Sequence, residues 1–147
     1  MTFFRKIIEI VIEIVIVFYP FIVSGEINQT VKNGVFELSL TQTEEVCHLV
    51  YTSPSTKGDL ALQVISPCNF HRSPDGEVRI MPTPKGDVML VESSRPHPSR
   101  PKDCDTQIQG IRISHEQIKI SSAISKVAMC PPFQWDEVMF LGIFGRD

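Results

Sequence analysis

The chain has 147 residues, of which 42% are hydrophobic, and its formal net charge at pH 7 is −3. A chain of this length corresponds to one domain that can bury a substantial hydrophobic core. Domains that bind nucleic acids usually carry an excess of basic residues, so this charge argues against that class and we expect no nucleic-acid partner.

The first predicted element is an N-terminal signal helix at residues 1–25. Two bases precede the apolar run Ile7–Val23, and the small residues Ser24-Gly25 follow it. This layout is typical of a secretory signal peptide. Glu9 and Glu13 interrupt the run, and the apolar part that remains is too short to span a bilayer. We expect cleavage after Gly25 and a periplasmic or secreted protein. The alternative is an uncleaved anchor, the one case in which we expect membrane contact.

Short apolar or alternating segments follow one another through residues 26–147, which we expect to form a single β domain. The alternation and the β-branched residues predict strands at Val35–Leu40, Val46–Thr52, Asp59–Ile65, Val78–Met81, Val88–Val91, Ile108–Ile113, Ile118–Ile120 and Val138–Phe144. Turn-forming pairs such as Asn33-Gly34 and Asp75-Gly76 separate several of them. This spacing predicts an all-β fold, a small antiparallel sandwich or barrel.

Four cysteines lie in this β region: Cys47, Cys68, Cys104 and Cys130. In an exported chain an even number of cysteines indicates two disulfides, and three pairings are possible. We favour the sequential pairing, Cys47–Cys68 and Cys104–Cys130.

The competing interpretation of the cysteines is a metal site. His48 follows Cys47, and His71 lies three residues after Cys68. Zinc sites usually contain at least one closely spaced ligand pair such as Cys-x-x-Cys, and none is present. We therefore predict no metal site and no other cofactor.

A basic, proline-rich segment covers Arg95–Lys102, with three prolines and three bases in eight residues. Proline has no amide hydrogen for a sheet ladder, so we expect a connection and not a strand. In the structural interpretation this is a stiff, solvated crossover. In the functional interpretation Arg95, His97, Arg100 and Lys102 contact a partner from a preorganised loop that loses little entropy on binding.

Trp135, the sole tryptophan, lies between the last cysteine and the last predicted strand. The favoured interpretation is that Phe133 and Trp135 close one end of the core. The alternative is that Trp135 anchors a partner, since tryptophan is common among the residues that dominate binding energy.

Common catalytic signatures are absent from the sequence: it has no Gly-x-Ser-x-Gly elbow, phosphate loop, His-Glu-x-x-His or dinucleotide fingerprint. The histidines, His48, His71, His97 and His115, fall in expected strands and turns or in the proline-rich segment. Packing or solvent exposure explains them, so we predict no catalytic residue and favour a protein that is not an enzyme.

The pattern Pro67-Cys68-x-x-x-Arg72, Asp75-Gly76, Cys104-Asp105-Thr106-Gln107-x-Gln109-Gly110 and Cys130 resembles that of small exported four-cysteine bacterial proteins of unassigned function. The resemblance covers about Cys47 to Phe144. It implies export and a two-disulfide β domain, and it carries over no catalytic residue and no named partner.

Three functional hypotheses remain open. The first is an exported binding protein that recognises another macromolecule, with a protein as the expected partner, as an inhibitor or an immunity protein does. The second is a structural or accessory protein of the envelope. The third, which we favour least, is a small metal-binding enzyme that uses His48 and His71.

Overall fold

The computed structural model describes residues 29–115 and 117–145. The predicted signal helix at residues 1–25 lies outside these residues, so it stays a prediction. Within the described part, no helix combines the length and hydropathy that a bilayer crossing requires.

The first sheet contains β1 (Gln29–Asn33), β2 (Phe36–Gln42), β3 (Val46–Thr52) and β4 (Lys57–Ile65). Its strands are antiparallel and follow one another in chain order. In β2, Phe36, Leu38 and Leu40 are buried while the residues between them are at least partly exposed. The sheet therefore has one apolar face, as the alternation in the sequence predicts.

The second sheet contains β5 (Cys68–Phe70), β6 (Met81–Thr83), β7 (Gly86–His97), β8 (Arg100–Ser114), β9 (Gln117–Ile120) and β10 (Ser125–Val127). Its order is β10-β8-β7-β5, with β6 paired to β7 and β9 paired to β8, all antiparallel. The long β7–β8 hairpin forms its centre.

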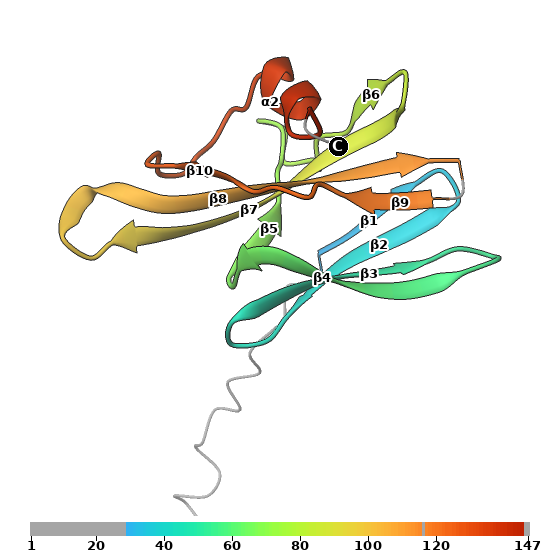
Figure 1. Ribbon diagram of the computed structural model, residues 1–147, viewed down its shortest axis with the longest axis horizontal. Coiled ribbons are helices and arrows are strands. Elements are labelled where there is room, and N and C mark those ends of the chain that lie inside the picture. The colour runs from blue at the N-terminus through green and yellow to red at the C-terminus, as the bar shows by residue number, and fades with distance from the viewer. Residues whose placement is uncertain (1–28, 116, 146–147) are drawn as a thin grey trace, which may run out of the picture.

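Both faces of the second sheet are covered, which explains the continuous apolar run in β7. Met89 and Val91 pack into the core between the two sheets, whereas Val88 and Leu90 pack into a second cluster on the outer face. Helix α2 (Glu137–Gly142) lies over that outer face (Figure 1). Two sheets and a short helix thus form three layers.

The prediction of a strand at Val138–Phe144 was wrong, because this segment contains α2. The Asp136 carboxylate accepts a hydrogen bond from the Met139 amide at 3.1 Å and caps the helix. Phe140, Ile143 and Phe144 are buried, whereas Val138 and Leu141 are exposed. Burial at intervals of three and four residues is the pattern of a helix that packs on one side.

The expectation that Arg95–Lys102 is a connection was also wrong. β7 continues to His97 and β8 begins at Arg100, so only residues 98 and 99 form the turn. Pro96 is paired with Cys104, and His97 is paired with Arg100. The three residues between those β8 partners form a bulge, which accommodates Pro101 where no regular ladder bond is needed.

The two disulfides join Cys47 to Cys68 and Cys104 to Cys130, which is the pairing favoured above, and no described cysteine is free. The first bridge connects β3 to β5 and therefore links the two sheets. The second connects β8 to the segment that follows β10. The all-β antiparallel sandwich with two disulfides is thus confirmed.

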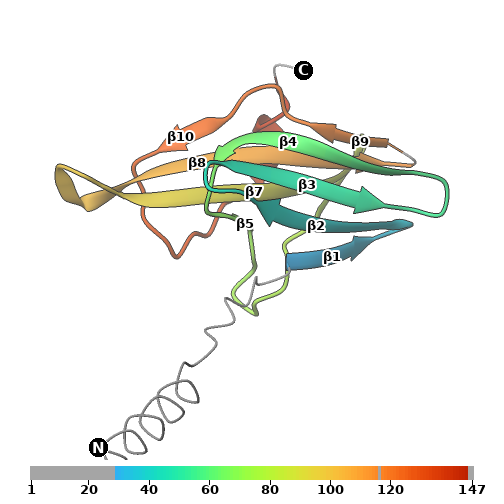
Figure 2. The same ribbon diagram turned by 90° about the horizontal axis from the view of Figure 1, so that it is seen from below.

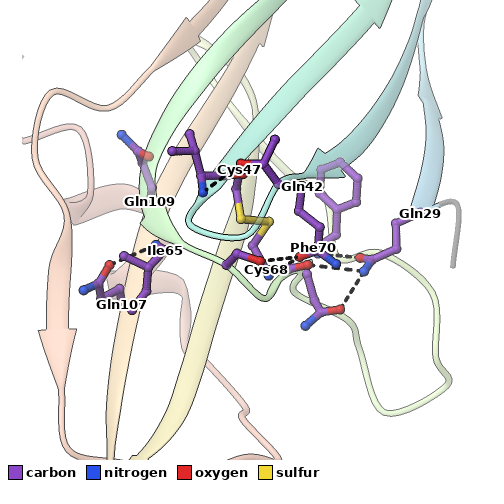
Figure 3. Close-up of a disulfide and its surroundings, with 12 residues drawn as sticks. Gln29, Gln42, Cys47, Ile65, Cys68, Phe70, Gln107 and Gln109 are labelled. Carbon is purple, nitrogen blue, oxygen red and sulfur yellow. Dashed lines mark hydrogen bonds between the residues drawn. A yellow bond between two sulfur atoms is a disulfide. The ribbon is translucent and has the colours of Figure 1, made fainter. Parts of the chain in front are cut away.

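Side-chain amides also join the two sheets (Figure 3). The side-chain oxygen of Gln109 accepts a hydrogen bond from the backbone amide of Gln63 in β4 at 2.7 Å. The side-chain oxygen of Gln107 accepts one from the backbone amide of Ile65 at 3.2 Å. Two glutamines of the first sheet bind β5 in the same way. The side-chain oxygen of Gln42 accepts a hydrogen bond from the backbone amide of Cys68 at 3.1 Å, and that of Gln29 accepts one from the backbone amide of Phe70 at 3.0 Å. We call these four residues the glutamine seam: Gln29, Gln42, Gln107 and Gln109.

We expect Gln109→Ala to lower the free energy of unfolding by about 1–3 kcal/mol, because it leaves polar backbone groups without partners. Gln109 is buried, and its Nε2 also donates to the Ser121 carbonyl at 3.0 Å. The matched control is Gln63→Ala, which removes an exposed glutamine side chain but keeps the backbone amide. Urea denaturation should show a change below about 0.5 kcal/mol for the control. Equal losses in the two variants would contradict a specific role of the seam.

Candidate functional site

The end of the β7–β8 hairpin is an arm that projects beyond the two sheets (Figures 1 and 2). We call residues 94–106 the ribbon. Its strands stay paired from Ser94 opposite Thr106 to Pro96 opposite Cys104 before the terminal turn. The proline-rich segment is therefore held in a defined hairpin by its own backbone pairing.

Side-chain contacts hold the base of the ribbon together and join it to the segment that follows β10. The Ser94 and Thr106 hydroxyls lie 2.8 Å apart, and the Thr106 hydroxyl donates to the Met129 carbonyl at 2.7 Å. The Cys104–Cys130 disulfide is adjacent to these contacts in sequence. Several links across β8 therefore fix the base of the ribbon.

Some of the basic residues predicted to contact a partner already contact other residues of this protein. Arg95 is exposed, but its guanidinium donates to the Ser66 carbonyl in the β4–β5 turn. Arg100 pairs with Asp103, with 3.4 Å between Nη1 and Oδ2. Arg95 thus also has a structural role, and part of the Arg100 charge is compensated at the surface.

Lys102 and His97 complete the predicted set. Lys102 is exposed, and no described carboxylate forms an ion pair with it. His97 is partly buried, and its Nδ1 accepts the Ser99 amide hydrogen at 3.2 Å, which orders the turn. Lys102 is therefore the most available base of the ribbon.

A groove of about 450 Å³ runs beside the ribbon, between β8, β10 and the end of β4. Charged groups, Arg100, Asp105 and Lys126, line it together with apolar Ile65 and Val127. Asp105 and Lys126 were not predicted as site residues, because the groove is assembled from three segments that are separate in the sequence. Mixed charge beside apolar surface suits a polypeptide segment better than a fully apolar ligand.

Trp135 lies away from this groove, in the cluster under α2. Its side chain is 6% exposed, its ring stacks on Phe133 at 4.9 Å, and its Nε1 donates to the Glu92 carboxylate at 2.8 Å. This position matches the core-closing interpretation. It leaves little of the indole surface for a partner.

His71 is buried in the same cluster and was expected at a turn. It is 1% exposed, and its Nδ1 lies 3.2 Å from Oε2 of Glu92, the oxygen that also binds Trp135. Glu92 therefore bridges His71 and Trp135. This arrangement positions the Trp135 ring against the second sheet.

The residues proposed for a metal-binding enzyme are not assembled into a ligand set. His48 lies on the first sheet, where its Nδ1 is 2.8 Å from the Asp59 carboxylate. Across residues 29–115 and 117–145, no three histidine, cysteine, aspartate or glutamate side chains gather closely enough to hold a metal ion. The candidate functional site is therefore the ribbon with its groove.

Comparison of the chain with known proteins found no matching family model, no matching curated protein and no matching solved structure. The resemblance to small exported four-cysteine proteins stays a prediction.

Proposed function

We propose that this protein is an exported binding protein that recognises a macromolecular partner, another protein, through the ribbon and its groove. The observation that carries the proposal is the projecting β7–β8 arm with exposed Arg100 and Lys102. A hairpin already held in one conformation loses little conformational entropy when a partner binds. Inhibitors and immunity proteins are the functional classes that fit this architecture.

The two disulfides support the cellular location in this proposal. Disulfides persist in oxidising compartments outside the cytoplasm. Both bridges are formed and no described cysteine is free. Together with the predicted signal helix at residues 1–25, they support a periplasmic or secreted protein.

The test of the ribbon uses the double variant Arg100→Ala/Lys102→Ala, with Arg95 retained because it contacts the body of the protein. We expect binding of the native partner to weaken about tenfold, since two rim charges together contribute about 1.4 kcal/mol. The melting temperature should stay within about 2 °C, because both residues are exposed. Affinity is measured by calorimetry with the partner isolated from the native host.

The matched control is Lys32→Ala/Lys57→Ala, which removes the same charge from exposed residues of the first sheet. It should bind as the wild type does. If both double variants bind equally well, the ribbon is not the recognition surface. If only envelope assembly components co-purify with the protein, the accessory-protein hypothesis replaces this one.

A further inference from the structure

Asn33 connects the two sheets at the end of the molecule opposite the ribbon. It is the last residue of β1, and the β1–β2 turn that follows it lies at that end (Figures 1 and 2). Its Nδ2 donates a hydrogen bond to the Asp87 carboxylate of β7 at 2.9 Å. Hydrogen bonds to an ionised acceptor are stronger than those between neutral groups. This contact therefore helps to hold β1 against the second sheet.

Water has access to the contact between Asn33 and Asp87. Both residues are partly exposed, and both line a hollow of about 620 Å³ between the β1–β2, β6–β7 and β8–β9 turns. Asparagine is among the thermolabile residues, because its side-chain amide can be lost when the next backbone nitrogen attacks it. Solvent access matters at Asn33 because that reaction consumes water.

The backbone nitrogen that follows Asn33 is accessible, because it belongs to a glycine in the turn. Gly34 is exposed, and a β-carbon there would have no atom within 4 Å beyond its immediate chain neighbours. Its amide donates no hydrogen bond to any described residue. Glycine samples more backbone conformations than other residues do, which lets its nitrogen approach the preceding side chain. The Gly34 nitrogen is therefore free to attack the side chain of Asn33.

The other described asparagine is not followed by a free nitrogen. Asn69 is exposed, but the next amide belongs to Phe70, which is buried. That amide donates a hydrogen bond to the Gln29 side-chain oxygen at 3.0 Å. Attack on the Asn69 side chain would first require this hydrogen bond to break. Asn69 is therefore an internal control for Asn33 within the same molecule.

The Asp75-Gly76 pair has the same spacing of an acidic or amide side chain before glycine, but its groups are occupied. The Gly76 amide donates to the Ser73 carbonyl at 2.8 Å, and the Asp75 carboxylate accepts a hydrogen bond from the Glu77 amide at 3.1 Å. Both reacting groups are thus held within the turn. The nitrogen that follows Asn33 has no such partner among the described residues.

We propose that Asn33 is a site of spontaneous deamidation in the folded protein and that the reaction breaks its contact with Asp87. The Gly34 nitrogen gives its proton to water and attacks Cγ of Asn33, so that an N–Cγ bond forms. The Cγ–Nδ2 bond then breaks, and Nδ2 takes up a proton and leaves as ammonia. Water opens the resulting five-membered ring at either carbonyl and gives aspartate or isoaspartate. The net reaction consumes one water, releases one ammonia and needs no enzyme.

Both products remove the hydrogen-bond donor that Asp87 now has. The aspartate product places a second carboxylate beside Asp87, and two carboxylates that share a site repel each other. The isoaspartate product also adds a negative charge, and it lengthens the backbone by one carbon at the β1–β2 turn. The link between β1 and β7 is therefore lost with either product. This modification is separate from the ribbon and does not depend on the protein-binding role proposed above.

The first test measures deamidation in the full chain with its disulfides intact. The protein is incubated in warm, mildly alkaline buffer, and peptide mapping by mass spectrometry detects the exchange of ammonia for water at each asparagine. Protein that was not incubated is digested in parallel to correct for deamidation during the mapping. We expect the modified fraction at Asn33 to exceed that at Asn69 about tenfold, since the Phe70 hydrogen bond must open before Asn69 reacts. Equal fractions at the two residues, or no reaction at Asn33, would overturn the proposal.

The second test uses Asn33→Asp, which reproduces one of the products. We expect its melting temperature to fall by about 5 °C, because it loses a hydrogen bond to a charged group and gains a repulsion. The matched control Asn69→Asp adds the same charge at an exposed position and keeps an acceptor for the Gln29 side-chain amide. Its melting temperature should stay within about 2 °C of the wild type.

The exchanged variant Asn33→Asp/Asp87→Asn reverses the donor and the acceptor of the same contact. We expect it to recover most of the melting temperature that Asn33→Asp loses. Recovery shows that the loss comes from this contact and not from the added charge alone. The proposed disruption is wrong if Asn33→Asp is as stable as the wild type, or if the exchanged variant is no more stable than Asn33→Asp.

Discussion

Replacing Cys47 and Cys68 together by alanine is expected to lower the free energy of unfolding by about 3–5 kcal/mol. The bridge closes a segment with a sequence separation of 21 residues, and loops of this size restrict the unfolded chain by about 3 kcal/mol. Both sulfur atoms also lie in the core between the sheets, so their removal leaves a cavity. Differential scanning calorimetry should record a clear fall in melting temperature.

The second disulfide provides the matched comparison. Cys104–Cys130 has a similar sequence separation of 26 residues, so its effect on the unfolded chain is similar. Cys130 is only partly buried, and its removal opens less of a cavity. We therefore expect Cys104→Ala/Cys130→Ala to cost about 1 kcal/mol less than the first pair. A larger loss from the second pair would show that the ribbon base, not the link between the sheets, limits stability.

Phe140→Ala is expected to lower the free energy of unfolding by about 3–5 kcal/mol, the usual cost of removing a buried aromatic ring. Phe140 is fully buried under α2 in the cluster with Trp135. Its ring centroid lies 6.0 Å from that of His71 and 4.9 Å from the Arg79 guanidinium. Removing the ring therefore leaves a cavity and deprives the Arg79 cation of its aromatic contact.

Leu141→Ala is the control for Phe140→Ala, because it alters the adjacent residue of the same helix, which is 56% exposed. Urea denaturation should show a loss below about 0.5 kcal/mol for this variant. Tryptophan fluorescence should separate the two variants in the folded state, since Trp135 belongs to the same cluster. Similar losses in both variants would mean that α2 is not held by its buried face.

Alternation of apolar residues predicted strands that have one buried face, such as Val35–Leu40, most of which lies in β2. The segment Val46–Thr52 has a mixed pattern, and it was predicted with the bounds that β3 has. β1, β5 and β10 were missed, because they are short and contain polar residues such as Lys32, Asn69 and Lys126. For Val78–Met81 the prediction was only partly right: Met81 begins β6, and Val78 makes an isolated bridge with Arg72.

The helix was missed although its sequence contains the relevant signals. Asp136 and Glu137 are typical of a helix start, and Phe140, Ile143 and Phe144 have helical spacing. In so short a segment an apolar run also fits a strand, and the choice depends on the surface that it covers. That surface is the outer face of β7 and β8. The continuous apolar run Val88–Val91 is compatible with burial on both faces, but it does not indicate which segment covers the outer face.

Partner contact by the ribbon residues was the functional alternative to a solvated crossover, and it stays a prediction; the geometry of the segment was predicted wrongly. Three prolines favoured a connection, whereas pairing of β7 with β8 continues past Pro96 and a bulge accommodates Pro101. The contact of Arg95 with Ser66 depends on the tertiary fold, because the two residues are far apart in the sequence. The contact of Arg100 with Asp103 depends on the local geometry of the hairpin. The groove with Lys126 depends on which strand lies beside β8, and sequence spacing does not reveal that.

The glutamine seam has a consequence for the behaviour of the protein at high concentration. β4 is the last strand of its sheet, and an uncovered strand of this kind can recruit a strand from another molecule and start aggregation. The amides of Gln63 and Ile65 are already occupied by Gln109 and Gln107, so a second chain cannot extend the ladder there without displacing them. Carboxamides do not titrate, so this protection is the same in an acidic environment as at neutral pH.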